Sequence, residues 1–288
     1  MTTSILVGTM MSHVNSSPIA DDAFENHVGL LPATNDEHGG VIVEMEEAMD
    51  CEIFADLLKA SMSYWTRQGK KGVWIKLPIQ LANLIETTVK EGFKYHHAEP
   101  DYLMLVYWIP KTKSLIPPNA THRVRVGALV LKDDKEVLVV QEKSGRFRGT
   151  GVWKIPTGVV EEGEDIFEAV VREVKEETGI DTKFMEILAF RQSLKSFFSK
   201  SDLFFLCILH PQSFDIQKQE LEIEAAQWMP FEDYAAQPFH QNHGLSKYIT
   251  DLCLAKQGGD YIGFSPRPIT SYFNDQPCYM YLNSQFQN

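Results

Sequence analysis

The chain has 288 residues, of which 44% are hydrophobic and 23% charged, an ordinary composition for one large folded domain or two smaller ones. Its 27 basic and 39 acidic side chains give a net charge of −12, which argues against a protein that binds the phosphates of nucleic acids. The four cysteines form no CxxC pair, so neither a disulfide framework nor a thiolate zinc site is expected.

The chain shows no pattern typical of a membrane or targeting segment. No apolar run approaches the ~20 residues that are needed to cross a bilayer. The first basic residue is Lys59, so the N-terminus lacks the charged region of a signal peptide. We therefore expect a cytosolic protein that binds neither nucleic acid nor membrane, with nuclear entry left open.

The first part of the chain predicts a tail followed by a small domain. Residues 1–38 are rich in Ser, Asn and Asp without periodicity, which predicts a flexible tail. A β-α-β-α-β succession over residues 39–112 predicts a small α/β domain, and a proline-rich stretch at 110–119 marks its end. The expected elements are strands at 41–43, 73–77 and 102–109 and helices at 54–65 and 78–91.

The region after the prolines predicts a second, larger domain over residues 120–257. Its first two strands flank Asp133-Asp134-Lys135, which is a hairpin signal. The expected elements are strands at 124–131, 136–141, 153–156, 184–190, 202–209 and 223–228 and helices at 165–178, 231–236 and 245–255. Residues 258–288 contain scattered Pro and Gly and predict a C-terminal tail, open to partial ordering against the domain.

The helix at 165–178 carries the most informative pattern. Three acidic residues at positions i, i+3 and i+4 share one side of it, namely Glu173, Glu176 and Glu177. An adjacent apolar side can pack on a sheet. Carboxylates this close repel one another, and a hard divalent cation such as Mg²⁺ would offset the repulsion. On the carboxylates alone, a solvated acidic helix face is the commoner interpretation.

The spacing of the residues around this helix favours the metal site over the solvated helix face. It reads G-x5-E-x7-R-E-U-x-E-E-x-G-U, where U is aliphatic, and this pattern resembles the Nudix box. All nine fixed positions are filled, by Gly158, Glu164, Arg172, Glu173, Val174, Glu176, Glu177, Gly179 and Ile180. The resemblance implies an α/β (α+β) fold, the Nudix α/β/α sandwich with a mixed sheet, preceded by the small N-terminal α/β domain.

The resemblance also implies a metal-dependent site. Glu176 and Glu177 would be the principal ligands of Mg²⁺, with Mn²⁺ as a substitute. Glu173 would be a ligand or the catalytic base, and the carbonyl of Gly158 a further ligand. Water activated by the metal and a carboxylate would then attack one phosphorus of a diphosphate.

Two further roles follow from the resemblance. Glu164 and Arg172 would form a structural ion pair between the loop and the helix. Members of the family commonly recruit one more catalytic carboxylate from outside the box. Glu222 is the preferred candidate here and Glu220 the second, although either is also consistent with a solvated loop position.

The resemblance extends beyond the box, to a plant group of cytosolic ADP-ribose and NADH pyrophosphatases with an N-terminal extra domain. The matching segments are residues 72–78, 91–109, 119–127, 188–192, 201–207 and 222–230. It implies hydrolysis of ADP-ribose and NADH to AMP plus ribose 5-phosphate or reduced nicotinamide mononucleotide. It also implies a homodimer.

Substrate contacts are less constrained by the sequence. Arg191, Lys154 and Arg148 are candidates for phosphate or ribose contacts, and Phe190 for stacking on adenine, although surface or core roles are common for such residues. Arg146, Phe147 and Trp153 are further candidates. A sanitiser of oxidised triphosphates such as 8-oxo-dGTP would use the same metal site. A nucleotide-sensing or protein-binding module without turnover is the third alternative, and the complete carboxylate set argues against it.

Overall fold

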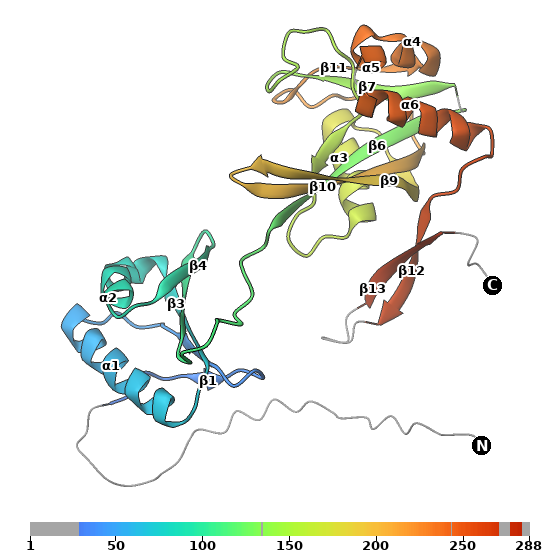
Figure 1. Ribbon diagram of the computed structural model, residues 1–288. Coiled ribbons are helices and arrows are strands. Elements are labelled where there is room, and N and C mark those ends of the chain that lie inside the picture. Colours follow the sequence, from blue (N-terminus) through green and yellow to red (C-terminus); the bar gives the residue numbers. More distant parts are fainter. Residues whose placement is uncertain (1–28, 134, 243, 271–276, 284–288) are drawn as a thin grey trace, which may run out of the picture. The chain divides into compact units, whose positions relative to one another are not determined.

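The computed structural model describes residues 29–133, 135–242, 244–270 and 277–283. The chain forms two compact units, Met1–Asn119 and Ala120–Asn288, and each has its own sheet (Figure 1). Most of the predicted N-terminal tail, residues 1–28, lies outside the described residues. No helix in the described ranges is long and apolar enough to cross a membrane.

Unit 1 contains a five-stranded sheet in the order β1-β2-β3-β5-β4, in which only β2 and β3 are parallel. Its strands are β1 (Thr34–Asn35), β2 (Val41–Glu44), β3 (Gly72–Pro78), β4 (Lys94–Ala98) and β5 (Tyr102–Trp108). Its helices are α1 (Cys51–Arg67), the 3₁₀ helix Ile79–Leu84, and α2 (Ile85–Lys90). The predicted β-α-β-α-β succession is therefore present, with two additional strands.

Helix α1 forms where local capping and apolar spacing agree. The Asp50 carboxylate accepts hydrogen bonds from the backbone N–H groups of Glu52 and Ile53, which caps the first turn. Phe54 and Leu58 are fully buried on the face that packs on the sheet. Burying two such side chains contributes roughly 3–6 kcal/mol to folding.

Unit 1 begins earlier than residue 39. Leu31 is buried in its core, and its backbone N–H donates to Ser61 Oγ at 2.9 Å. β1 then pairs antiparallel with β2. Residues 29–38 are thus part of the folded unit, and a two-residue strand is too short to produce a periodic signal in the sequence.

Unit 2 contains a mixed sheet in the order β11-β7-β6-β10-β9-β12-β13, with β8 paired to β6. The β6–β10 pair is parallel and the others are antiparallel. The strands before the last hairpin are β6 (His122–Lys132), β7 (Glu136–Glu142), β8 (Thr157–Val159), β9 (Thr182–Phe197), β10 (Lys200–Pro211) and β11 (Ile223–Pro230). At the predicted strand 153–156 there is an isolated bridge between Lys154 and Val140.

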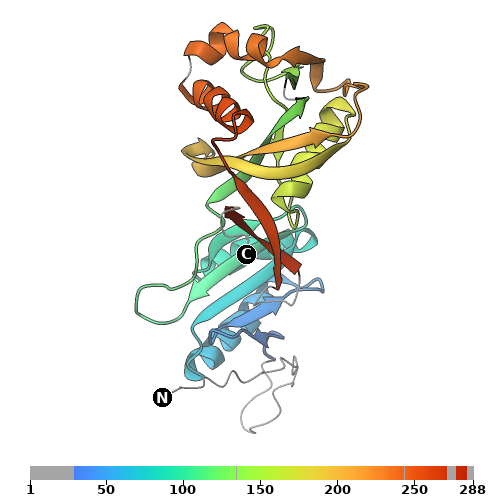
Figure 2. The same cartoon turned by 90° about the vertical axis from the view of Figure 1, so that its right-hand side faces the viewer.

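Helices cover both faces of this sheet, and the expected α/β/α sandwich is confirmed (Figures 1 and 2). On one face, α3 (Ile166–Thr178) packs Val170 and Val174 against Val126 of β6. The other face is covered by α4 (Phe231–Ala236) and α6 (Gly244–Gln257), with α5 (Pro238–Asn242) between them in sequence. Alternation along β6 sends Val126 to one layer and Leu129 to the other.

The region expected to be a C-terminal tail contains a hairpin of β12 (Phe264–Thr270) and β13 (Pro277–Asn283). β12 joins the sheet where Phe264 pairs with Ile187 of β9. The hydroxyl of Tyr281 hydrogen-bonds to Asp165, at the start of α3. Figure 2 shows the hairpin as a red ribbon. Its prolines, unusual inside strands, explain why the sequence pattern predicted a tail.

Candidate functional site

Several positions of the motif shape α3 itself. Asp165 and Glu168 form a capping box at the first turn. Gly179 ends the helix in the left-handed conformation, with φ of 75°, which a glycine adopts without strain. Val174 and Ile180 are fully buried. The motif therefore combines structural positions with chemical ones, and α3 presents its carboxylates at a fixed place beside the sheet.

Arg172 connects the loop before α3 to the helix. Its guanidinium donates two hydrogen bonds to Glu164, at 2.7 and 2.9 Å, in a bidentate arrangement. It also donates to the Val159 carbonyl and to the carboxylates of Glu173 and Glu176, each at 3.0 Å. The hydrogen bond from Arg172 lowers the pKa of Glu164, and the same contact raises the pKa of Arg172. The predicted Glu164–Arg172 pair is therefore formed.

Glu173 lies directly over Gly158 of β8. A Cβ atom on Gly158 would lie 1.7 Å from Glu173 Cδ, so only glycine leaves room for this carboxylate. The backbone N–H of Val159 donates to Glu173 Oε1 at 3.1 Å. Burial raises the pKa of Glu173, and the hydrogen bond from Arg172 opposes this shift.

Glu177 is the most buried carboxylate of the motif, with 7% of the residue exposed. Its Oε2 atom is buried and has no hydrogen-bond partner among the residues that the structure describes. Burial raises the pKa of Glu177 to about 8, the charge of Lys154 opposes the shift, and Glu173 and Glu142 add to it. A buried carboxylate with an unsatisfied oxygen is costly unless a cation or proton compensates it.

Carboxylates from four parts of the sequence line one cavity of about 500 Å³, and Glu161, in the loop between β8 and α3, is one of them. Glu173 and Glu177 come from α3, Glu142 from the end of β7, and Glu222 from the residue before β11. β11 pairs with β7 so that Ile223 lies opposite Glu142, and the Lys143 N–H donates to the Glu222 carbonyl at 2.7 Å. This pairing places Glu222 beside the helix carboxylates.

Glu142 has a role that the sequence did not indicate. It forms an ion pair with Lys154, which also donates to Thr157 Oγ1 at 3.2 Å. No local pattern around Glu142 distinguishes it from other acidic residues at strand ends, so only its strand pairing could have identified it. Glu220, the second candidate outside the motif, is exposed and pairs with Lys143 and Lys218.

Glu176 differs from its two neighbours. Its side chain is 53% exposed and bonds Arg172, and it does not line the carboxylate cavity. In the described part of the chain, no three His, Cys, Asp or Glu side chains are grouped closely enough to hold a metal ion. The unpartnered oxygen of Glu177 and the raised pKa values of Glu173 and Glu177 nevertheless fit a site that takes a divalent cation.

A second cavity of about 510 Å³ shares Glu142 with the first. Phe147 and Arg148, from the loop after β7, line it together with Lys143 and Glu224. The Phe147 ring contacts Phe239 edge-to-face, with 4.9 Å between ring centroids. Two predicted substrate contacts, Arg148 here and Lys154 beside Glu142, thus lie near the carboxylates.

The other two predicted substrate contacts, Arg191 and Phe190, lie on β9 and outside both cavities. Arg191 lies beside the ring of Phe204, 5.9 Å from its centroid, and its buried Nε has no hydrogen-bond partner in the described part of the chain. Phe190 is 62% exposed and packs on Phe205. Neither residue lines either cavity.

Comparison with known proteins matches both units to family models. Residues 31–109 match the model described as Nudix hydrolase domain, and residues 121–251 match the NUDIX domain. Nudix hydrolase 2 of Arabidopsis thaliana is 60% identical over 91% of this chain and 93% of its own length. Nudix hydrolase 10 of the same plant is 60% identical over 89% of this chain and 91% of its own. The human nucleoside diphosphate-linked moiety X motif 6 is 35% identical over 69% of this chain and 65% of its own length.

Proposed function

The chain belongs to the Nudix hydrolase family, and from this premise we propose that it hydrolyses the pyrophosphate bond of nucleoside diphosphates linked to another group. ADP-ribose and NADH are the proposed substrates, with AMP as the shared product. The name of the human relative supports the substrate class, since it refers to a nucleoside diphosphate-linked moiety. The proposed enzyme acts in the cytosol as a homodimer.

The observation that carries the proposal is the convergence of Glu173, Glu177 and Glu222 on one cavity. Uncompensated carboxylates repel one another and favour unfolding, so such a cavity is hard to account for by stability alone. A cation bound between the carboxylates and a diphosphate would neutralise the negative charge of both. Because Glu222 comes from a distant segment, the folded chain adds a carboxylate to those of the helix.

The residues present fit a divalent cation. When bound, Mg²⁺ or Mn²⁺ would neutralise diphosphate oxygens and lower the pKa of an attacking water. Glu173 and Glu177 would hold the cation, together with the carbonyl of Gly158. Glu176 remains a predicted ligand, although its carboxylate is bonded to Arg172.

The chain itself supplies orientation and proton transfer. Arg172 and the Val159 N–H hold the Glu173 carboxylate in one position, so little reorganisation is needed when substrate binds. Burial raises the pKa of Glu177 to about 8, and a bound cation would stabilise the ionised carboxylate that serves as its ligand. We propose Glu222, which lines the same cavity, as the base that takes the proton from the attacking water.

The neighbouring cavity suits the rest of the substrate. The Arg148 side chain has no ion pair within the described part of the chain, so it is available for a phosphate or a ribose hydroxyl. The Phe147 ring is held by Phe239 and offers an aromatic surface for a base. Lys154, paired with Glu142, would contact phosphate only if the substrate displaced that pair. Arg191 and Phe190 remain predicted contacts.

The test is turnover of ADP-ribose, NADH and 8-oxo-dGTP with Mg²⁺ by the full chain and by Glu177→Gln. We expect Mg²⁺-dependent AMP release from ADP-ribose or NADH, reduced at least about a hundredfold in the variant. Glu232→Gln, in the first turn of α4, is the matched control and should retain activity. Preferential turnover of 8-oxo-dGTP would instead identify a triphosphate sanitiser, and no turnover of any substrate by folded protein would refute the proposal.

A further inference from the structure

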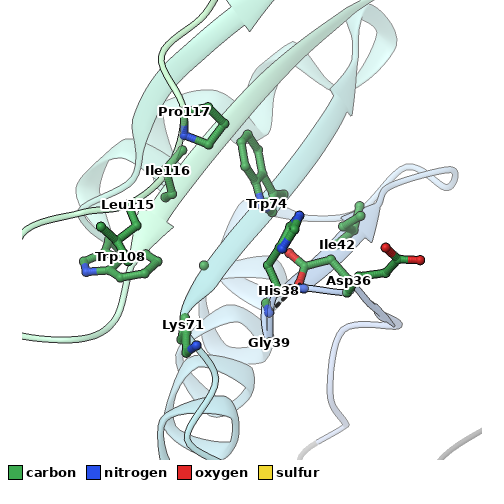
Figure 3. Close-up of a pocket in the computed structure, with 13 residues that line it drawn as sticks. Asp36, His38, Gly39, Ile42, Lys71, Trp74, Trp108, Leu115, Ile116 and Pro117 are labelled. Atoms are coloured by element: carbon green, nitrogen blue, oxygen red, sulfur yellow. Dashed lines mark hydrogen bonds between the residues drawn. The ribbon is translucent and has the colours of Figure 1, made fainter. Parts of the chain in front are cut away.

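A separate cavity of about 790 Å³ lies within unit 1. Its walls come from the β1–β2 turn, the start of β3, the end of β5, and residues 115–117 of the segment that follows β5 (Figure 3). None of these residues belongs to the carboxylate site. The volume lies in the range of small-molecule sites, which are mostly apolar with a few polar groups.

The cavity lies on the sheet face that α1 does not cover. Val73 and Ile75 of β3 are buried in the core of unit 1, so by strand alternation Gly72 and Trp74 face the other way. Trp108 pairs with Gly72 across the sheet and lies on the same face. The indole rings of Trp74 and Trp108 are half-buried on this face, and they provide a surface on which a planar ring can stack.

Gly72 leaves the floor of the cavity open. A Cβ atom at this position would meet only Trp74 Nε1 at 3.6 Å and the Ile116 side chain at 3.9 Å, both ordinary contact distances. The φ of Gly72 is not positive, so the strand backbone does not require glycine. The absent side chain therefore creates space over the strand, and a larger residue would fill it without backbone strain.

Hydrogen-bond donors predominate around this floor. Neither Trp74 Nε1 nor the Lys71 ammonium has a hydrogen-bond or ion-pair partner within the described ranges of the chain, and the same holds for the His38 ring. Figure 3 shows Lys71, Trp74 and His38 around the cavity. Unpaired donors beside an apolar surface favour a ligand that brings acceptors or negative charge.

Within the described residues, the acidic residues at the rim form no ion pair with Lys71. Asp36 Oδ1 already accepts hydrogen bonds from the backbone N–H groups of His38 and Gly40, at 2.8 and 2.6 Å, and so stabilises the β1–β2 turn. Glu37 is exposed, where water and salt screen its charge. Lys71 is therefore the ammonium group of the cavity that is available to an anionic ligand.

We propose that this cavity binds a planar aromatic compound that bears a carboxylate or another anionic group. The ring stacks on Trp108 over the Gly72 floor, beside the edge of Trp74. The anionic group pairs with Lys71 and accepts a hydrogen bond from Trp74 Nε1. The N-terminal unit is thus a small-molecule binding domain in its own right, distinct from the proposed hydrolytic site.

Three probes that share one ring system test the proposal on the full chain: 2-naphthoate, neutral 2-naphthalenemethanol and cationic 2-naphthylmethylammonium. Binding is followed by shifts of backbone amide signals in ¹H–¹⁵N spectra. We expect saturable shifts at Gly39, Gly40 and Gly72, with the highest affinity for 2-naphthoate and the lowest for the cation. Stronger binding of the cation, or shifts confined to other residues, would overturn the proposal.

Substitutions at Lys71 and Gly72 test separately the charge of the cavity and the open space above its floor. Lys71→Gln should weaken 2-naphthoate binding about fivefold, toward the neutral probe, because one partly exposed ion pair is lost. Lys94→Gln removes the same charge from exposed β4 of the same unit and should change nothing. Gly72→Val should abolish binding of all three probes, whereas Gly72→Ala should retain it. Equal effects of Lys71→Gln and Lys94→Gln would exclude the proposed ion pair, independently of whether Gly72→Val folds.

Discussion

The Glu173 carboxylate occupies the space that a side chain on residue 158 would need. A Cβ atom on Gly158 would come within 1.7 Å of Glu173 Cδ and 1.9 Å of its Oε1. The pair joins β8 to α3, because the same carboxylate also accepts from the Val159 N–H. A glycine and a glutamate fifteen residues apart in the sequence thus form one structural unit of the site.

Gly158→Ala should therefore displace Glu173. We expect activity to fall by about two orders of magnitude, because small displacements of catalytic groups are that costly, with a stability loss of about 1–3 kcal/mol. Steady-state kinetics and thermal unfolding measure the two effects. Gly244→Ala is the control, since nothing lies within 4 Å of a Cβ there. A fully active Gly158→Ala enzyme would show that the position of Glu173 is unimportant.

Arg172→Lys should break the connection between loop and helix although the charge is kept. A lysine ammonium cannot make the bidentate contact to Glu164 and reach the Val159 carbonyl at once. We expect the free energy of unfolding to fall by about 2 kcal/mol, measured by denaturant titration. Arg267→Lys, at an exposed position of β12, should be neutral, and equal stability of both variants would contradict the prediction.

The metal-free protein should lose stability as pH rises from about 4.5 to about 8. The pKa of Glu177 is raised in the folded state, so between these pH values the folded chain binds more protons than the unfolded chain. The slope of unfolding free energy against pH is then negative. Unfolding curves in EDTA across this range measure the effect, on the order of a few kcal/mol.

Glu177→Gln should remove most of this pH dependence, because the amide does not ionise. At pH 8 in EDTA we expect the variant to be more stable than the unaltered protein. Mg²⁺ should raise the unfolding temperature of the unaltered protein at pH 8 and have a much smaller effect on the variant. An unchanged pH slope in Glu177→Gln would assign the titration to another group.

Arg148→Gln should affect substrate binding more than the chemical step. The guanidinium lines the cavity beside the carboxylates, so its loss should raise KM for ADP-ribose about tenfold with a smaller change in kcat. Arg146→Gln, two residues earlier and not lining the cavity, is the matched control. A KM that is unchanged in Arg148→Gln would remove this residue from the proposed substrate contacts.

Local patterns predicted much of this protein. The spacing around α3 identified the Glu164–Arg172 pair, and the predicted helix at 165–178 agrees with Ile166–Thr178. Capping residues and an apolar face within one helix suffice for such a prediction, because both act over a few residues. The strands of unit 2 were also located, although β9 extends well beyond the predicted 184–190.

Elements with weak local signals were not predicted. β1 has two residues, and the hairpin of β12 and β13 contains prolines and joins the sheet through the pairing of Phe264 with Ile187. β1 pairs with nearby β2 but is too short to give a periodic signal, whereas the hairpin depends on β9, a partner far away in the sequence. A local pattern records neither a two-residue strand nor a distant partner, so the sequence predicted tails in both places.

The sequence by itself determined the family motif and the helix that presents its carboxylates, since these depend on residue spacing and periodicity. The layer order of unit 2 followed from the resemblance to the Nudix family. Only the tertiary structure decided which carboxylates share a cavity. The pairing of β11 with β7 places Glu222 and Glu142 in the same cavity as the helix carboxylates. Glu176 instead forms an ion pair with Arg172. The reason is physical, because strand pairing and burial act between residues that are distant along the chain. Burial raises the pKa of Glu177 and leaves its Oε2 atom without a hydrogen-bond partner among the described residues.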